Sequence, residues 1–82
     1  MKFKEQVIIK GKAYEIDKND VVNVLKNMRP DRIRKFYIEA NENKYPVTQA
    51  LAATVKLPKA FVGSNVALLF LSKIGFEIKE NF

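Results

Sequence analysis

Two runs rich in apolar residues stand near the start of the chain. The first covers residues 3–9, the second covers residues 13–16, and Lys10-Gly11-Lys12 separates them. Short apolar runs of this length are typical of strands, and glycine supplies the positive backbone φ that a tight hairpin turn needs. The pattern predicts an N-terminal β-hairpin.

Apolar residues next recur at helical spacing between Val21 and Met28. Residues 17–20 include several side chains that commonly cap a helix, and Pro30 disfavours helical backbone at the residue before it. We therefore expect a helix from about Asn19 to Met28.

The middle of the chain predicts strand, turn, strand and helix in immediate succession. Residues 36–40 alternate like a strand with one buried face, residues 41–43 tolerate turn conformations, and Pro46 suits the first turn of a helix. We expect the sheet to end near Tyr45 and a helix to run from Pro46 to about Lys56. At this corner Tyr45 is expected to face solvent beside free amide groups, a geometry that suits an anion but is also an ordinary way to join two elements.

The last third of the chain predicts one more helix and one more strand. We expect a helix from Asn65 to Ile74, because Ser64 is a good N-cap and Gly75 fits the position that follows a helix. Apolar side chains continue without a break from residue 66 to residue 71, so this helix is expected to be the core helix or to lend a side to a partner subunit. Its expected apolar stripe is Val66, Leu69, Phe70 and Ile74. Residues 76–79 alternate again and predict a last strand.

The predicted order β-β-α-β-β-α-α-β indicates an α+β fold. We expect one small domain covering residues 1–82, with an N-terminal hairpin, three short helices and a small, mostly antiparallel sheet. The helix that begins at Pro46 is expected to bury one face and to leave three residues on its other sides, Thr48, Gln49 and Ala52. A chain of 82 residues is near the lower limit for a self-sufficient core, which makes a dimer interface plausible.

The composition removes most enzyme and metal chemistry. The chain contains no cysteine and no histidine, so it lacks thiolate ligands, the usual general base and the commonest neutral metal ligand. It also has no glycine-rich phosphate loop and no carboxylates at metal-binding spacing. We expect a protein that is not an enzyme and that uses no metal or cofactor. The first residues lack the apolar run of a signal peptide and no segment is long enough to span a bilayer, so we expect no membrane contact and a cytoplasmic location.

Positive charge is concentrated between the first predicted helix and the central strand. The formal net charge is +6, which favours a polyanionic partner. The densest cluster contains Arg29, Arg32, Arg34 and Lys35. On a short helical turn Arg29, Arg32 and Lys35 would project to one side, where arginine can hold phosphate with its planar fork. The alternative is a solvated connector whose arginines pair with nearby acids, namely Asp31, Glu39 or Glu42.

Two functional hypotheses follow from these patterns. The first is a non-catalytic module that contacts the sugar-phosphate backbone of DNA or RNA without reading bases. Its candidate contacts are Arg29, Arg32, Arg34, Lys35, Lys44, Tyr45 and Thr48. The second is a protein-interaction or structural module that forms a homodimer, or binds a partner protein, through the C-terminal helix. Its candidate contacts are Val66, Leu68 and Leu71.

Four motifs in fixed order carry a resemblance that covers residues 35–78. They are Lys44-Tyr45-Pro46-Val47-Thr48-Gln49-Ala50-Leu51, Leu57-Pro58, Phe61-x-x-Ser64 and Leu71-Ser72-Lys73-Ile74-Gly75-Phe76-Glu77-Ile78. This order resembles a pattern in small uncharacterised prokaryotic proteins. It is distantly similar to the modified-DNA-reading modules, including sulfur-binding domains, of modification-dependent restriction endonucleases. The resemblance implies a nucleic-acid partner and a pocket wall at Tyr45 and Pro46 that meets the sugar-phosphate backbone. Thr48 stands where the pattern usually has lysine, and Asn43 where it usually has glycine.

Overall fold

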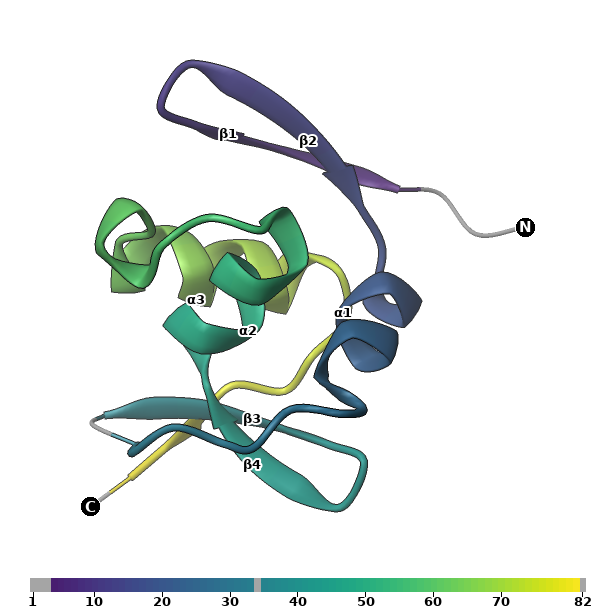
Figure 1. Cartoon of the computed structure of the whole chain (residues 1–82), viewed down its shortest axis with the longest axis vertical. Coiled ribbons are helices and arrows are strands. Elements are labelled where there is room, and N and C mark those ends of the chain that lie inside the picture. Colours follow the sequence, from purple (N-terminus) through teal and green to yellow (C-terminus); the bar gives the residue numbers. More distant parts are fainter. Residues whose placement is uncertain (1–3, 34, 82) are drawn as a thin grey trace.

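Helices occupy the middle of the molecule, between a two-stranded hairpin on one side and a three-stranded sheet on the other (Figure 1). The computed structural model describes residues 4–33 and 35–81. Its strands are β1 (Glu5–Ile9), β2 (Lys12–Ile16), β3 (Phe36–Ala40), β4 (Asn43–Pro46) and β5 (Lys79–Glu80). Its helices are α1 (Lys18–Leu25), α2 (Val47–Val55) and α3 (Ser64–Lys73), with a short 3-10 helix η1 (Lys59–Phe61). The predicted α+β class is confirmed, with the strands divided between two small antiparallel sheets.

The predicted N-terminal hairpin is confirmed. β1 and β2 pair antiparallel, with Ile9 opposite Lys12 at the closed end. The two residues of the turn, Lys10 and Gly11, both have positive φ, at 54° and 78°. A two-residue loop with this backbone matches the right-handed twist of the strands that it joins. Alternation along β1 buries Val7 and Ile9 against the helices and leaves the residue between them exposed.

A second hairpin forms most of the other sheet, whose strand order is β4-β3-β5. Asn41 and Glu42 make its turn, again with positive φ at both positions, 52° and 65°. Alternation buries Ile38 and Ala40 of β3 on the side of the helices. β5 covers only two residues, opposite Phe36 and Tyr37 of β3. The strand expected over residues 76–79 therefore begins later and is shorter.

Helix α1 begins with two reciprocal hydrogen bonds. The carboxylate of Asp17 accepts from the backbone N–H of Asp20 at 2.8 Å, and the carboxylate of Asp20 accepts from the N–H of Asp17 at 3.0 Å. This capping box satisfies two amide groups that the first turn leaves without helical partners. The helix ends at Leu25, three residues earlier than expected, and buries Val21 and Leu25 completely.

Helix α2 is the core helix of the fold. It packs against α1, α3, η1, β3 and β4. Six of its nine residues are buried, and these include Gln49 and Ala52, which the sequence analysis placed on its outer sides. Its alanines let neighbouring elements approach closely from several directions. The expectation that α3 is the core helix is therefore wrong.

The face that α3 buries also differs from the expected stripe. Ala67, Phe70 and Leu71 point into the core, whereas Val66 is 43% exposed and Leu69 is 68% exposed. An unbroken apolar run has no period that marks one face, so contacts with α2 decide which residues are buried. Helix α3 also begins one residue earlier than expected, at Ser64, and the N-cap is the residue before it.

The C-terminus of α3 is closed by a Schellman motif, as the position of Gly75 predicts. Gly75 has a φ of 110°. Its N–H donates to the carbonyl oxygen of Ser72 at 3.1 Å, and the N–H of Phe76 donates to that of Leu71 at 3.0 Å. Phe76 and Leu71 are both buried, which is the apolar contact that accompanies this motif. The Leu-to-Phe spacing of the closing sequence motif therefore has a structural explanation.

Candidate functional site

The α1–β3 link, residues 26–35, carries the basic cluster. Within its described residues, 26–33 and 35, the backbone forms no helix, so the helical turn on which Arg29, Arg32 and Lys35 would project to one side is not formed there. The link is held instead by side chains of two buried residues that come later in the chain, Tyr45 and Gln49. Arg29, Arg32 and Lys35 remain exposed.

Tyr45 is one of the two residues that hold the link. Its side chain is 0% exposed, and its hydroxyl oxygen lies 2.9 Å from the carbonyl oxygen of Leu25 and 3.0 Å from that of Met28. The single hydroxyl proton can be donated to either carbonyl. The expectation that Tyr45 faces solvent and meets a phosphate is therefore wrong. A tyrosine on the inner face of β4 is buried because β4 alternates in step with β3.

Gln49 is the second residue that holds the link, a role that was not predicted from the sequence. Its Nε2 donates to the carbonyl oxygen of Arg29 at 2.8 Å, and its Oε1 accepts from the N–H of Asp31 at 2.7 Å. Both ends of the buried amide are thus satisfied by link backbone. The available signal was a glutamine within the otherwise apolar run of α2.

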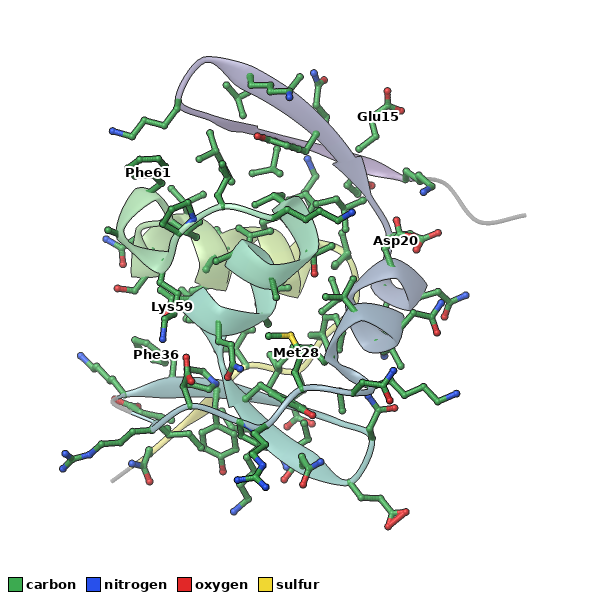
Figure 2. The ribbon with its side chains drawn as sticks, viewed as in Figure 1. Glu15, Asp20, Met28, Phe36, Lys59 and Phe61 are labelled. Carbon is green, nitrogen blue, oxygen red and sulfur yellow. The ribbon has the colours of Figure 1, made fainter. Side chains whose placement is uncertain are left out.

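A shallow groove of about 1270 Å³ lies between the end of the link, the start of α2 and the start of α3. We call it the basic groove. Figure 2 shows Lys59 of η1 and Phe36 of β3 facing one another at this place. Its lining residues are Asp31, Arg32, Ile33, Lys35, Phe36, Pro46, Val47, Thr48, Lys59, Ala60, Ser64, Asn65 and Asn81.

The electrostatics of the basic groove favour an anion. Arg32, Lys35 and Lys59 line it, against one carboxylate among the described residues, that of Asp31. The first residues of α2 and α3 also line it, and neither helix has a side-chain cap or an acidic residue in its first turn. The free amide groups of a helix N-terminus carry partial positive charge. Two such termini and three cations therefore face the same space.

Two of the three acids named as alternative partners of the arginines form ion pairs with lysines instead. Asp31 forms an ion pair with Lys59, and Glu39 forms one with Lys79 at 2.9 Å. The hydrogen bond from Lys79 to Glu39 raises the pKa of Lys79. In the described ranges, Arg29, Arg32, Lys35 and Lys44 take part in no ion pair. Their charge is therefore available to a partner.

The structure brings together only part of the predicted nucleic-acid set. Arg32, Lys35 and Thr48 line the basic groove. Pro46 lines it as the sequence resemblance implies, but Tyr45 does not. Two more predicted residues lie outside it: Arg29 is exposed on the link, and Lys44 lies on the outward face of β4, its Nζ 5.4 Å from the ring centroid of Tyr37. The remaining one, Arg34, lies outside the described residues.

The residues expected to form a protein interface are also divided. Leu71 is buried in the core and cannot contact a partner. Leu68 is half-buried, and Val66 is exposed. The most exposed apolar side chain of α3 is Leu69, which the sequence analysis placed on the core stripe.

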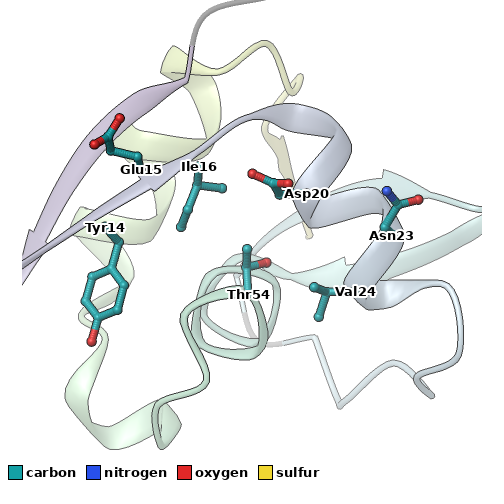
Figure 3. Close-up of a pocket in the computed structure, with 7 residues that line it drawn as sticks. All are labelled: Tyr14, Glu15, Ile16, Asp20, Asn23, Val24 and Thr54. Atoms are coloured by element: carbon teal, nitrogen blue, oxygen red, sulfur yellow. The ribbon is translucent and has the colours of Figure 1, made fainter.

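A second hollow of about 310 Å³ lies between β2, α1 and α2 (Figure 3). Tyr14 and Ile16 leave β2 on the side opposite to Glu15, and Thr54 of α2 lies on that same side. The other lining carboxylate, that of Asp20, is already bound within the cap of α1. This hollow holds none of the predicted site residues.

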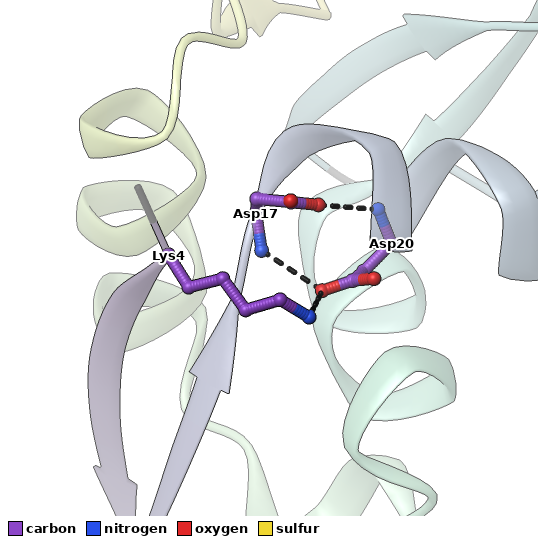
Figure 4. A network of polar contacts seen from close by, with 3 residues as sticks. All are labelled: Lys4, Asp17 and Asp20. Carbon is purple, nitrogen blue, oxygen red and sulfur yellow. Dashed lines mark hydrogen bonds and ion pairs between the residues drawn. The ribbon is translucent and has the colours of Figure 1, made fainter. Parts of the chain in front are cut away.

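Lys4 completes the polar network at the start of α1 (Figure 4). Its Nζ donates to the Asp20 carboxylate at 2.9 Å. This hydrogen bond, followed by the one from the backbone N–H of Asp17, lowers the pKa of Asp20. The same contact raises the pKa of Lys4. The network links the residue just before β1 to the first turn of α1.

Comparisons with protein families, with curated proteins and with solved structures give no significant match to this chain. The resemblance to prokaryotic DNA-reading modules therefore stays a prediction from sequence. None of the helices in residues 4–33 and 35–81 combines the length and the apolar surface that crossing a bilayer requires. In the same part of the chain, no three acidic side chains lie close enough together to hold a metal ion.

Proposed function

We propose that this protein is a non-catalytic module that binds the sugar-phosphate backbone of nucleic acid in the basic groove. The observation that carries the proposal is the meeting of Arg32, Lys35 and the uncapped N-terminus of α2 in one groove. Arginine holds phosphate oxygens with two parallel hydrogen bonds, and lysine adds a point charge. Because nucleic acid is an intracellular partner, the proposal carries the expectation of a cytoplasmic location.

The groove is shaped for backbone contact. Apart from its cations and one carboxylate, its polar side chains are short, namely those of Thr48, Ser64, Asn65 and Asn81. Such groups, like free amide groups at a helix start, commonly contact phosphate and sugar. No helix of the described chain presents a row of long polar side chains to a major groove. We therefore expect little sequence preference and strong dependence on salt.

Fluorescence anisotropy with labelled duplex and single-stranded DNA tests the proposal. Each phosphate neutralised contributes about −0.9 to the slope of log K against log salt on duplex DNA and about −0.7 on single strands. Replacing two of the three groove cations, in the variant Arg32→Glu/Lys35→Glu, should weaken binding strongly and flatten the slope by roughly 1.4–1.8. Absence of binding to either form by the unaltered protein at low salt would refute the proposal.

A matched control separates the groove from net charge. Lys12 and Lys26 are exposed and do not line the groove. Lys12→Glu/Lys26→Glu changes the net charge by the same amount as the groove variant, so it should retain most of the affinity. Equal losses in the two double variants would mean that general charge, rather than the groove, attracts the nucleic acid.

A second candidate function is protein contact through the outward face of α3. Val66 and Leu69 lie three residues apart and are both exposed, which places them on the same side of the helix. Leu69→Glu should abolish a dimer in sedimentation velocity without unfolding the chain. A wild-type protein that sediments as a monomer at high concentration would remove the homodimer version of this candidate.

A further inference from the structure

The outward face of the three-stranded sheet carries an aromatic ring in a central position. Tyr37 belongs to β3, the middle strand of the sheet. Alternation turns Ile38 toward the helices and Tyr37 away from them. All three long helices lie on the other side of this sheet (Figure 1). Tyr37 is half-buried, so part of the residue is accessible on this face.

The strands on both sides of Tyr37 each place a lysine on its face of the sheet. On β4 its cross-strand partner is Pro46, and on β5 its partner is Lys79. Lys44 reaches over the ring from β4, with Nζ 5.4 Å from the centroid. Glu39 is the carboxylate on this face of β3, and its charge is offset by the ion pair with Lys79.

Pro46 connects the outward face of the sheet to the basic groove. It lies directly opposite Tyr37 in the sheet and also lines that groove. Tyr37 itself does not line the groove, and Phe36, which does, packs against the core from the other face of β3. A nucleic-acid strand whose phosphates follow the groove can therefore reach the ring of Tyr37 by passing Pro46 onto the outward face.

We propose that Tyr37 is a stacking platform for an unpaired base and that the partner of the basic groove is single-stranded nucleic acid. The inference rests on the function proposed above. Base stacking on aromatic side chains beside a positively charged track is the usual way to hold single strands without sequence preference. In a duplex both faces of each base are covered by neighbouring bases, so the ring could not be used. Lys44 is exposed and forms no ion pair within the part of the chain that the structure describes, so it can contact the phosphate adjacent to the stacked base.

Three probes of equal length test the inference: a labelled thymidine oligonucleotide, an abasic oligonucleotide with the same phosphates, and a duplex. The wild-type protein should bind the thymidine strand roughly tenfold more tightly than the abasic strand, the effect of about one stacked base. Tyr37→Ala should remove that preference and leave the affinity for the abasic strand and the duplex unchanged. Tyr37→Phe, which keeps the ring, should behave like wild type.

The outcomes separate this inference from the proposed function. Equal wild-type affinity for the thymidine and abasic strands overturns the stacking platform, and this comparison needs no variant. Unchanged thymidine binding in Tyr37→Ala overturns it as well. In either case, a loss of binding in Arg32→Glu/Lys35→Glu would still support nucleic-acid binding in the basic groove. If wild type binds none of the three probes at low salt, both proposals fail together.

Discussion

The hydroxyl oxygen of Tyr45 lies 2.9 Å from the carbonyl oxygen of Leu25, the last residue of α1. The bond joins the start of the α1–β3 link to a strand twenty positions later in the chain. Asn43 donates its Nδ2 hydrogen to the same hydroxyl, at 3.5 Å. Because Tyr45 is buried and hydrogen-bonded in this way, it holds the first residues of the link against the core. It thereby helps to position the exposed cations without touching a ligand.

Tyr45→Phe should destabilise the protein and spare the binding site. The substitution keeps the ring but leaves the carbonyl oxygens of Leu25 and Met28 without this donor, at a cost of about 1–2 kcal/mol. Urea denaturation measures the free energy of unfolding. At low temperature, where the variant is folded, its affinity for nucleic acid should stay within about twofold of wild type. A variant as stable as wild type with much weaker binding would mean that the hydroxyl contacts the ligand.

Asp31→Asn should strengthen anion binding. Asp31 contributes the one carboxylate among the described groove residues and pairs with Lys59. Removing its charge frees Lys59 and removes repulsion of a phosphate, worth about 1 kcal/mol at close range in water, or roughly fivefold in affinity. The backbone bond from Asp31 to Gln49 is unaffected. The control is Glu42→Gln, which makes the same charge change at the exposed β3–β4 turn and should alter affinity less. Equal gains in both variants would contradict a specific role of Asp31.

Acid should weaken the cap of α1. The folded-state pKa of Asp20 is lowered by the hydrogen bond from Lys4 and by the backbone N–H of Asp17. Its contribution to stability is therefore complete above the unfolded-state pKa of about 3.9 and is lost as pH falls through the lower folded-state value. Asp20→Asn should show a smaller loss of stability than wild type between about pH 5 and pH 2. Lys4→Met, which keeps the capping box, should fall between the two, and identical pH profiles for all three proteins would contradict this role.

Replacing Lys56 by glycine should stabilise the end of α2. Lys56 has a φ of 60°, and the N–H of the next residue, Leu57, donates to the carbonyl oxygen of Ala52 at 3.0 Å. This is a Schellman motif with lysine where glycine is preferred. Lys56→Gly should raise the free energy of unfolding by about 1 kcal/mol, because a Cβ atom is unfavourable in this backbone region.

The matched control for Lys56 lies at the end of α1. Lys26 has a right-handed helical backbone, with φ −54°, so Lys26→Gly should lower stability, by up to about 1 kcal/mol. Thermal denaturation of the two variants shows directly whether each substitution raises or lowers the stability. The same sign for both would contradict the conformational explanation.

Local features of the chain were predictable because their signals are local. Gly11 and the residues around Asn41 mark the two hairpin turns, and Gly75 marks the end of α3. The burial of Tyr45 and Gln49 was not predictable in this way. Their partners are backbone groups of the link and of Leu25, 17–20 positions earlier for Tyr45 and 18–20 for Gln49. No sequence pattern of period two or 3.6 encodes such a pairing.

In the candidate site, too, features with a local sequence signal were predictable and contacts between distant parts of the chain were not. Exposure of Arg32 and Lys35 follows from their charge, and both were among the predicted contacts. The basic groove is assembled from four separate parts of the chain, around residues 31–36, 46–48, 59–65 and 81. That assembly depends on α2 lying at the centre of the fold. The sequence pattern pointed to α3 instead, because the apolar run of α3 is longer and more continuous.

Amide chemical-shift mapping tests the basic groove most directly. A ¹⁵N-labelled sample is titrated with a short thymidine oligonucleotide at low salt and again at high salt. We expect the largest shifts at Arg32, Lys35, Thr48 and Asn65, all reduced at high salt, and little change in the hairpin of β1 and β2. Shifts confined to that hairpin, or no shifts at low salt, would contradict nucleic-acid binding in the basic groove.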